Sequence, residues 1–408
     1  MRPSALAVVA LVAAAVGGLV ALVAVDQTGL LDGGTETVFV GGSGTPLPVE
    51  REIETPDGAA EPPVGNSFDP ATIYQSRSGG VVTVYAYFED RPSAQHAAQG
   101  SGFVISKEGY ILTSAHVVTT AGDGDGTGEP EAADSVYVGF RDRDRVEAKV
   151  IGWDVFDDVS VLKVDPEAHS LDPVPLGDSS RVGVGEPVAA LGSPFGNESS
   201  LSVGVVSATR RSIDSITSAY DVADAIQTDA PITHGNSGGP LFDARGRVIG
   251  INAQIRSDSG QSQGVGFAIP INAAKRSFSQ IVRNGRVAYA YVGVNAEDLT
   301  PSIAERFDYP VDRGAVIATV VPQSPGERAG LRGGSERRRF NGFDVRVGGD
   351  VVVQIGLREV RSADDLVRIV SERLAPGQVV RFTLLRDGRR LVVPVRLGER
   401  PRRPREDE

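Results

Sequence analysis

Apolar positions divide the chain into stretches of different periodicity. The first stretch runs from Pro3 to Val25, where no residue is charged and Ala, Val and Leu fill nearly every position. A helix of this length can cross a hydrocarbon core of about 30 Å, so we predict a transmembrane helix here. Residues 26–68 are rich in Gly, Pro, Thr and acids and show no lasting period, which is typical of a flexible linker.

From about Phe68 to Ile269, short apolar runs alternate with turn residues. No helical pattern lies between these runs, so we predict two antiparallel barrels of six strands each rather than a parallel sheet. The expected strands of the first barrel are 81–88, 102–106, 110–114, 136–140, 146–151 and 159–164. Those of the second are 187–191, 201–207, 225–228, 240–242, 248–252 and 265–269.

Helical periodicity appears after the predicted barrels. We expect a helix over 271–284, with Gly285 just past its end. A second helix is expected over 362–374, with Ser362 as its N-cap, inside a small mixed α+β domain. The apolar faces of the two helices are Ile271, Ala274, Phe278 and Ile281, and Leu366, Ile369, Val370 and Leu374. The whole chain is therefore predicted to be mainly β.

Three residues in the barrel region suggest a serine hydrolase. Ser237 lies in Gly-Asn-Ser-Gly-Gly-Pro, where a tight turn can expose its hydroxyl and aim its N–H and that of Gly235 at a developing oxyanion. His116 ends one apolar strand and Asp158 begins another. The order His, Asp, Ser along the chain is the one found in trypsin-like double barrels.

Taken together, these motifs resemble the HtrA (DegP/DegS-like) family of serine proteases over roughly residues 69–399. The resemblance implies that Ser237 attacks the scissile carbonyl, His116 removes its proton and Asp158 orients the imidazole. It also implies that the N–H groups of Gly235 and Ser237 form the oxyanion hole. The matching segments are 100–105, 113–118, 158–163, 191–196, 226–241 and 264–270. The implied substrate-binding residues are Val265, Gly266, Phe267 and Ala268.

Some assignments have alternatives. Asp157 and Asp154 are the other candidates for the acid, although an extended backbone would point Asp157 to the opposite face from Asp158. His234 stands three residues before Ser237, but a residue on the same tight loop seldom reaches the hydroxyl, so we interpret it as a bystander. No Asp occupies a trypsin-like pocket-floor position, and we expect cleavage after a small aliphatic residue.

Composition limits the chemistry and the partners. The chain has no cysteine and only four histidines, so we expect no zinc site, no disulfide and no cofactor. A partial calcium-loop pattern at 123–128 with Asp134 fits an acidic surface loop better than a metal site. The net charge is −12, with −16 on residues 1–285 and +4 on the remainder, which argues against nucleic acid as a partner.

The segments 291–294, 314–317 and 324–331 resemble the family's PDZ domain. The resemblance implies that a peptide C-terminus binds along a sheet edge, with helix 362–374 as the other wall of the groove. Its carboxylate would be received by Tyr291, Val292, Gly293 and Val294. An Arg-rich insertion at 333–348 departs from the family; we predict a solvated loop, with contact to acidic lipids or substrate tails as the alternative.

We therefore expect a membrane anchor (1–25), a linker (26–68), a protease domain (69–285), a PDZ domain (286–399) and a solvated tail (400–408). Arg2 before the span and acids after it favour an extracytoplasmic catalytic domain, with cleavage of the span as a signal peptide as the alternative. The predicted function is ATP-independent proteolysis of misfolded or exposed proteins, by a homotrimer if the family resemblance holds. The alternatives are a catalytically silent binding or holdase protein and a regulatory sheddase of one membrane partner.

Overall fold

The computed structural model describes residues 68–89, 97–122, 129–193, 200–232, 235–253 and 265–402. The predicted transmembrane helix, the linker up to residue 67, His96, His234, residues 123–128 and the tail from residue 403 lie outside the described residues. Within the described ranges, no helix combines the length and the apolarity that crossing a bilayer requires.

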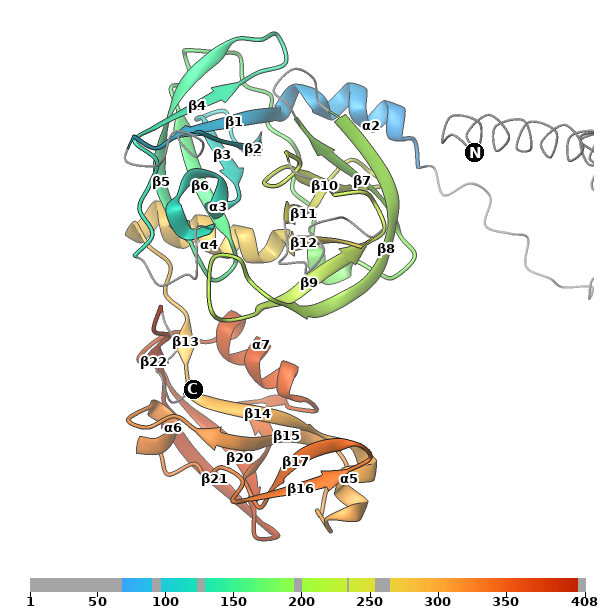
Figure 1. Ribbon diagram of the computed structural model, residues 1–408, viewed down its shortest axis with the longest axis vertical. Coiled ribbons are helices and arrows are strands. Elements are labelled where there is room, and N and C mark those ends of the chain that lie inside the picture. Colours follow the sequence, from blue (N-terminus) through green and yellow to red (C-terminus); the bar gives the residue numbers. More distant parts are fainter. Residues whose placement is uncertain are drawn as a thin grey trace, which may run out of the picture. The chain divides into compact units, whose positions relative to one another are not determined.

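The first six predicted strands close into one antiparallel barrel (Figure 1). Their order around the barrel is β1-β2-β3-β6-β5-β4. Alternating side chains point inward, and residues such as Val84, Ile111 and Leu162 form its core. The strands are β1 (Val81–Tyr87), β2 (Ala97–Val104), β3 (Tyr110–Thr113), β4 (Ser135–Gly139), β5 (Arg145–Asp154) and β6 (Val159–Val164).

The second set closes in the same way, in the order β10-β11-β12-β9-β8-β7. The prediction of two six-stranded barrels is thus confirmed. β8 is longer than the predicted 201–207. The apolar pattern does not predict its outer half, because this half pairs with β9 through bulges and carries mostly exposed polar residues. The strands are β7 (Pro187–Gly192), β8 (Ser200–Ile213), β9 (Val222–Thr228), β10 (Pro240–Asp243), β11 (Val248–Ala253) and β12 (Gly266–Pro270).

Three helices accompany the barrels. α4 (Ile271–Asn284) has the predicted bounds and ends at Gly285, which adopts a left-handed φ of 71°. It packs against β5 and β11, one strand from each barrel. The apolar pattern does not predict α2 (Pro70–Arg77), because Ile73 is its only buried residue. α3 (Ala115–Val118) is a single turn after β3, so His116 lies on a helical turn rather than at the end of a strand.

The C-terminal domain is a mixed α+β domain, as predicted. Its main sheet has the order β14-β15-β18-β20-β21, with β19 paired to β18, and α7 (Ala363–Arg373) buries Leu366, Ile369 and Val370. The strands of this sheet are β14 (Val294–Leu299), β15 (Gly314–Val320), β18 (Val351–Ile355), β19 (Arg358–Glu359), β20 (Val379–Arg386) and β21 (Arg389–Arg396). The remaining elements are α5 (Pro301–Arg306), α6 (Pro325–Arg328), and β13 (Ala290–Tyr291) paired with β22 (Gly398–Glu399).

The insertion at 333–348 is largely exposed, as predicted, but it is not a loop. It contains a β-hairpin formed by β16 (Glu336–Phe340) and β17 (Phe343–Val347). Asn341 and Gly342 connect the strands with φ values of 49° and 86°, the left-handed pair that a tight hairpin turn requires. Val345 and Val347 are buried, and they anchor the hairpin to the domain.

Residues Pro63–Glu408 make up one compact unit. The hydrophobic clusters of the described residues all lie within it, so this part of the chain contains the cores needed for folding.

Candidate active site

His116 and Asp158 lie side by side. His116 belongs to α3, and Asp158 directly precedes β6. The Nδ1 atom of His116 lies 2.7 Å from Asp158 Oδ2, and the backbone N–H of His116 donates to Asp158 Oδ1 at 2.9 Å. Because both carboxylate oxygens are engaged by one residue, the imidazole is fixed with Nε2 on the side away from Asp158.

The local backbone explains this contact. β3 pairs with β6 through Thr113 and Ser160, so the residues that follow β3 meet those that precede β6. Asp158 has a φ of 50°, in the left-handed region that Asp tolerates better than most residues. Its carbonyl accepts from the N–H of Ala115 at 3.2 Å, and its side chain is buried. The carboxylate is therefore shielded from competing water.

The turn that carries Ser237 packs against the same region. The N–H of Ser101 donates to the Ser237 carbonyl at 2.8 Å. Gly238 has a φ of 84°, and a Cβ atom there would lie 2.2 Å from the Ser101 carbonyl oxygen and 2.5 Å from Thr113 Oγ1. Only glycine fits this position, which holds the turn against the end of β3, the strand that leads to His116.

The Ser237 hydroxyl is buried and has no hydrogen-bond partner among the described residues. The acid–base pair is thus formed while the hydroxyl carried by the neighbouring turn is not engaged. Catalytic hydrogen bonds often tighten only when substrate binds, so this arrangement is compatible with a serine nucleophile awaiting its substrate.

A chain of buried hydroxyl groups reaches Gly235, the other residue of the expected oxyanion hole. Thr83 Oγ1 donates to Ser193 Oγ at 2.5 Å, and the Ser193 N–H donates to Ser101 Oγ at 2.8 Å. Ser101 Oγ in turn donates to the Gly235 carbonyl at 2.5 Å. This chain joins β1, β2 and the end of β7 to the Ser237 turn, and it fixes the orientation of the peptide group that follows Gly235.

Ser101 lies in the motif segment 100–105, but the sequence predicts no role for its side chain. Its local signal is a hydroxyl between two glycines, Gly100 and Gly102. A Cβ atom on Gly100 would lie 2.6 Å from Val117 Cγ2 and 3.1 Å from the Ser237 carbonyl oxygen. The glycine therefore permits the close approach of β2 to the Ser237 turn.

The predicted substrate segment lies at the start of β12. Val265 is 42% exposed, whereas Gly266, Phe267 and Ala268 are buried. Phe267 packs in the main core cluster and Ala268 in the core of the second barrel. A Cβ atom on Gly266 would lie 2.9 Å from the Ala230 carbonyl oxygen, so the absence of a side chain permits this packing.

Two families match the chain, one for a trypsin-like peptidase domain over residues 100–251 and one for a PDZ domain over residues 290–397. A probable periplasmic serine endoprotease, DegP-like, from Hahella chejuensis is 38% identical over 77% of this chain and 60% of that protein. A relative of the same description from Marinomonas sp. is 36% identical over 76% of this chain and 59% of that protein. This chain thus spans less than two thirds of the length of these relatives.

Solved structures agree with this similarity. The HtrA-type protease AlgW with a tripeptide has a TM-score of 0.66 at 33% identity, over 82% of this chain and 98% of that one. The chain belongs to the HtrA family of serine proteases. The serine endoprotease from Yersinia pestis is also similar, with a TM-score of 0.56 at 28% identity, over 84% of this chain and 100% of that one. The resemblance inferred from the sequence motifs is confirmed.

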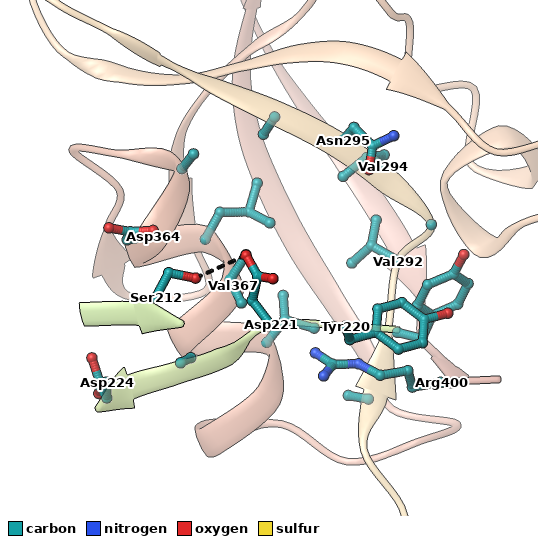
Figure 2. Close-up of a pocket in the computed structure, with 18 of the residues that line it drawn as sticks. Ser212, Tyr220, Asp221, Asp224, Val292, Val294, Asn295, Asp364, Val367 and Arg400 are labelled. Atoms are coloured by element: carbon teal, nitrogen blue, oxygen red, sulfur yellow. Dashed lines mark hydrogen bonds between the residues drawn. The ribbon is translucent and has the colours of Figure 1, made fainter. Parts of the chain in front are cut away.

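The PDZ domain of this HtrA protein borders a cavity of about 520 Å³ (Figure 2). Val292, Gly293 and Val294 line one wall, and Leu366 and Val370 of α7 line another. The outer part of the β8–β9 hairpin and the turn between its strands form a further wall. The sequence did not predict this wall. The lining residues of this wall include Arg210, Ser212, Tyr220, Asp221 and Asp224.

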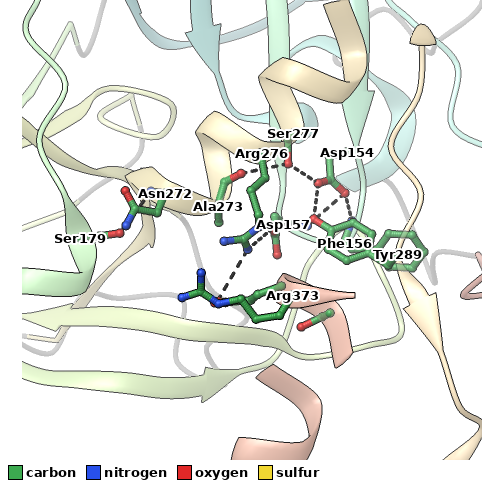
Figure 3. A network of polar contacts seen from close by, with 12 residues as sticks. Asp154, Phe156, Asp157, Ser179, Asn272, Ala273, Arg276, Ser277, Tyr289 and Arg373 are labelled. Atoms are coloured by element: carbon green, nitrogen blue, oxygen red, sulfur yellow. Dashed lines mark hydrogen bonds and ion pairs between the residues drawn. The ribbon is translucent and has the colours of Figure 1, made fainter. Parts of the chain in front are cut away.

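Near Asp158, a buried polar network gathers the two alternative acids (Figure 3). Asp154 Oδ2 accepts from the hydroxyl group of Ser277 at 2.6 Å. Tyr289 Oη lies 2.5 Å from Asp154 Oδ2 and 2.6 Å from Asp157 Oδ2. Burial, reinforced by the charge of Asp157, raises the pKa of Asp154 to about 6. Asp154 and Asp157 are thus directed to Tyr289, whereas Asp158 is the acid that contacts His116.

Arg276 of α4 connects this network to α7 of the PDZ domain. Its guanidinium lies 3.9 Å from Asp157 Oδ2 and 3.7 Å from Glu372 Oε1 (Figure 3). Burial raises the pKa of Glu372 to about 7, against the opposing effect of Arg276. Ionised Glu372 is therefore available to Arg276 mainly above neutral pH.

Arg400 adds a contact of another kind. Its guanidinium carbon lies 5.4 Å from the ring centroids of Phe156 and Tyr289 and 5.3 Å from that of Tyr220. Each ring face attracts a cation. Arg400, the first residue after β22, therefore connects the loop before Asp158 to the turn between β8 and β9.

Proposed function

We propose that this HtrA protein is an ATP-independent serine endopeptidase. The observation that carries the proposal is the His116–Asp158 pair, held through both carboxylate oxygens beside the Ser237 turn. Ser237 Oγ attacks the scissile carbonyl carbon, and Nε2 of His116 takes its proton while Asp158 stabilises the imidazolium. The N–H groups of Gly235 and Ser237 stabilise the oxyanion.

The intermediate then collapses to an acyl-enzyme, and His116 gives the proton to the departing amine. A water molecule deprotonated by His116 attacks the ester and releases the second product, which restores the Ser237 hydroxyl. We expect Val265 and its neighbours in β12 to contact the substrate and to favour a small aliphatic residue before the cut.

The proposed substrates are misfolded or exposed polypeptides outside the cytoplasm, in protein quality control. The names of the DegP-like relatives, which describe periplasmic enzymes, support this location. We further propose that residues 3–25 anchor the chain in the cell membrane, and that three copies assemble through protease domains spanning 69–285. The PDZ domain, within 286–399, would bind peptide C-termini through Tyr291–Val294; AlgW was solved with a tripeptide and with a decapeptide, which supports a peptide ligand.

The unengaged Ser237 hydroxyl also favours a regulated enzyme, such as a sheddase that cuts one membrane partner after activation. Peptide binding in the PDZ cavity is a plausible trigger, because the β8–β9 hairpin forms one of its walls. A catalytically silent binding protein is the third candidate, and it requires no cleavage under any condition.

The decisive test uses fragment 63–408 without ATP, incubated with a permanently unfolded protein and with a fluorophosphonate probe. We expect the wild type to cleave the protein and to be labelled, while Ser237→Ala does neither. Ser302→Ala, a change at an exposed serine of α5, serves as the matched control and should behave as the wild type. Cleavage only after addition of C-terminal peptides would favour the regulated enzyme. Cleavage by Ser237→Ala, or silence of the wild type with every peptide, would contradict the proposed mechanism.

A further inference from the structure

We propose that the hairpin β16–β17 is a docking surface for a membrane of anionic phospholipids. The hairpin is formed by the Arg-rich insertion. It takes no part in the proposed peptidase reaction. The inference rests on the proposed membrane anchor only to bring the hairpin close to a bilayer. The attraction between the hairpin and the lipids comes from the hairpin's own side chains.

The strand register separates the hairpin into two faces. Cross-strand partners share a face, so Val345 and Val347 lie on the face that is buried against the domain. The opposite face presents the pairs Arg337–Arg346 and Arg339–Asp344. Three arginines thus lie on the outer face with Asp344, and the Glu297 carboxylate accepts from the backbone N–H of Arg346 at 3.3 Å.

Within the described part of the chain, no ion pair involves Arg337, Arg339 or Arg346, whereas Arg338 on the other face pairs with Glu336 at 2.6 Å. The excess positive charge contrasts with the −16 carried by residues 1–285. Guanidinium groups bind phosphate oxygens through paired N–H donors, so a phospholipid headgroup fits this face.

The tip of the hairpin is aromatic. Phe343 is 74% exposed. Its cross-strand partner Phe340 packs edge-on against Phe307 at 5.9 Å between ring centroids, so the tip is braced from one side. Phe343 lies on the same face as Val345 and Val347, but at the tip of the hairpin it is exposed.

An exposed aromatic ring on one face and arginines without ion pairs on the other are combined in segments that lie in the membrane interface. An acidic polypeptide would also attract the arginines but would leave Phe343 without an apolar environment. The uncharged stretch 3–25 would hold the protein at a bilayer, where such a surface can act. These observations favour a membrane over an acidic polypeptide.

The test is sedimentation of fragment 63–408 with vesicles of equal parts phosphatidylglycerol and phosphatidylcholine, and with vesicles of phosphatidylcholine alone. The fragment lacks the stretch 3–25, so only its own surface can bind. Each arginine near an anionic surface contributes about fivefold in partitioning, so Arg337→Gln/Arg339→Gln/Arg346→Gln should lose roughly 100-fold. Phe343→Ser should lose roughly tenfold, and salt at about 0.5 M should weaken wild-type binding strongly.

The matched control is Arg381→Gln/Arg389→Gln/Arg390→Gln, which removes the same charge from β20 and β21 and should retain most of the binding. Equal losses in the two triple variants would overturn the proposal, since general charge would then explain binding. Equal binding to pure phosphatidylcholine, no vesicle binding, or binding to polyglutamate in place of vesicles would also overturn it. Both triple variants should still cleave a soluble unfolded protein, and Ser237→Ala should still bind vesicles, so this proposal and the proposed peptidase activity can fail separately.

Discussion

The phenol oxygen of Tyr289 lies 2.6 Å from the carboxylate of Asp157, the residue directly before Asp158. The same oxygen lies 2.5 Å from Asp154. A phenol has one proton and can donate to only one of two carboxylates, so the second short contact requires a proton on a carboxyl group. Burial raises the pKa of Asp154 to about 6, which makes Asp154 the group that takes up this proton.

Asp154→Asn should therefore remove a pH dependence of stability. The raised pKa means that the folded protein binds this proton more tightly than the unfolded chain. The Asp154 contribution to the free energy of unfolding thus falls as pH rises from about 4 to about 6. Above pH 6 the variant should be more stable than the wild type by up to about 3 kcal/mol, and the difference should vanish near pH 4.

Urea unfolding followed by fluorescence tests this expectation, since Trp153 is the only tryptophan and precedes Asp154. Asp214→Asn, a change at an exposed acid, is the control and should leave the pH profile unchanged. A constant difference between Asp154→Asn and the wild type across this pH range would show that Asp154 does not hold the proton.

Ser101→Ala should lower kcat while leaving KM nearly unchanged. The change removes the donor to the Gly235 carbonyl and the acceptor for the Ser193 N–H, so the oxyanion hole loses its support. We expect a loss of about 10- to 100-fold in kcat and about 1–2 kcal/mol in stability. Steady-state peptide hydrolysis separates the two constants. Ser106→Ala is the control, because that hydroxyl takes no part in the hydrogen bonds between Ser193, Ser101 and Gly235, and an equal kcat loss there would refute the proposed role.

Gly238→Ala should abolish activity. The new Cβ atom would lie 2.2 Å from the Ser101 carbonyl oxygen, and the φ of 84° disfavours any side chain. We expect at least a 1000-fold loss in kcat/KM, roughly the effect of dismantling the oxyanion hole. Gly388→Ala provides the comparison, since it has a φ of 73° with open space around it. It should cost about 1 kcal/mol in stability and leave activity intact.

Arg400→Met should loosen the contact among Phe156, Tyr220 and Tyr289. Methionine retains the apolar packing but not the cation, so about 1–2 kcal/mol of cation–π attraction is lost. Thermal unfolding of fragment 63–408 measures the change. Arg402→Met is the control, because Arg402 pairs with the exposed Glu129, and a similar drop in both midpoints would assign the effect to surface charge alone.

The sequence was sufficient for elements whose pattern is local. Alternation of apolar residues located all twelve barrel strands, and a 3.6-residue period located α4 and α7. It was insufficient where few residues are buried, as in α2, or where bulges and polar residues hide the strand, as in the outer half of β8. The Arg-rich insertion shows a third cause: its Asn-Gly turn was present in the sequence, but charge obscured the hairpin pattern.

The candidate site divides in the same way. Short motifs brought His116, Asp158 and Ser237 to notice, because each is recognisable from its neighbours. The hydroxyl chain through Ser101 joins residues 92 to 134 positions apart, and Tyr289 reaches Asp154 across 135 positions. Such partners meet only through barrel closure and the path of α4, and no local pattern predicts them.

Closure of both barrels has a further consequence for the proposed activity on unfolded chains. Open sheet edges invite extended polypeptides to add as extra strands, which would clog an enzyme surrounded by its own substrates. The barrels offer no such edge. In the main PDZ sheet β14 and β21 end the strand order, and the two-residue β19 pairs only with β18. Val294, Asn295 and Ala296 of β14 line the cavity opposite α7, so one of these two edges is the place where capture of a passing chain is useful.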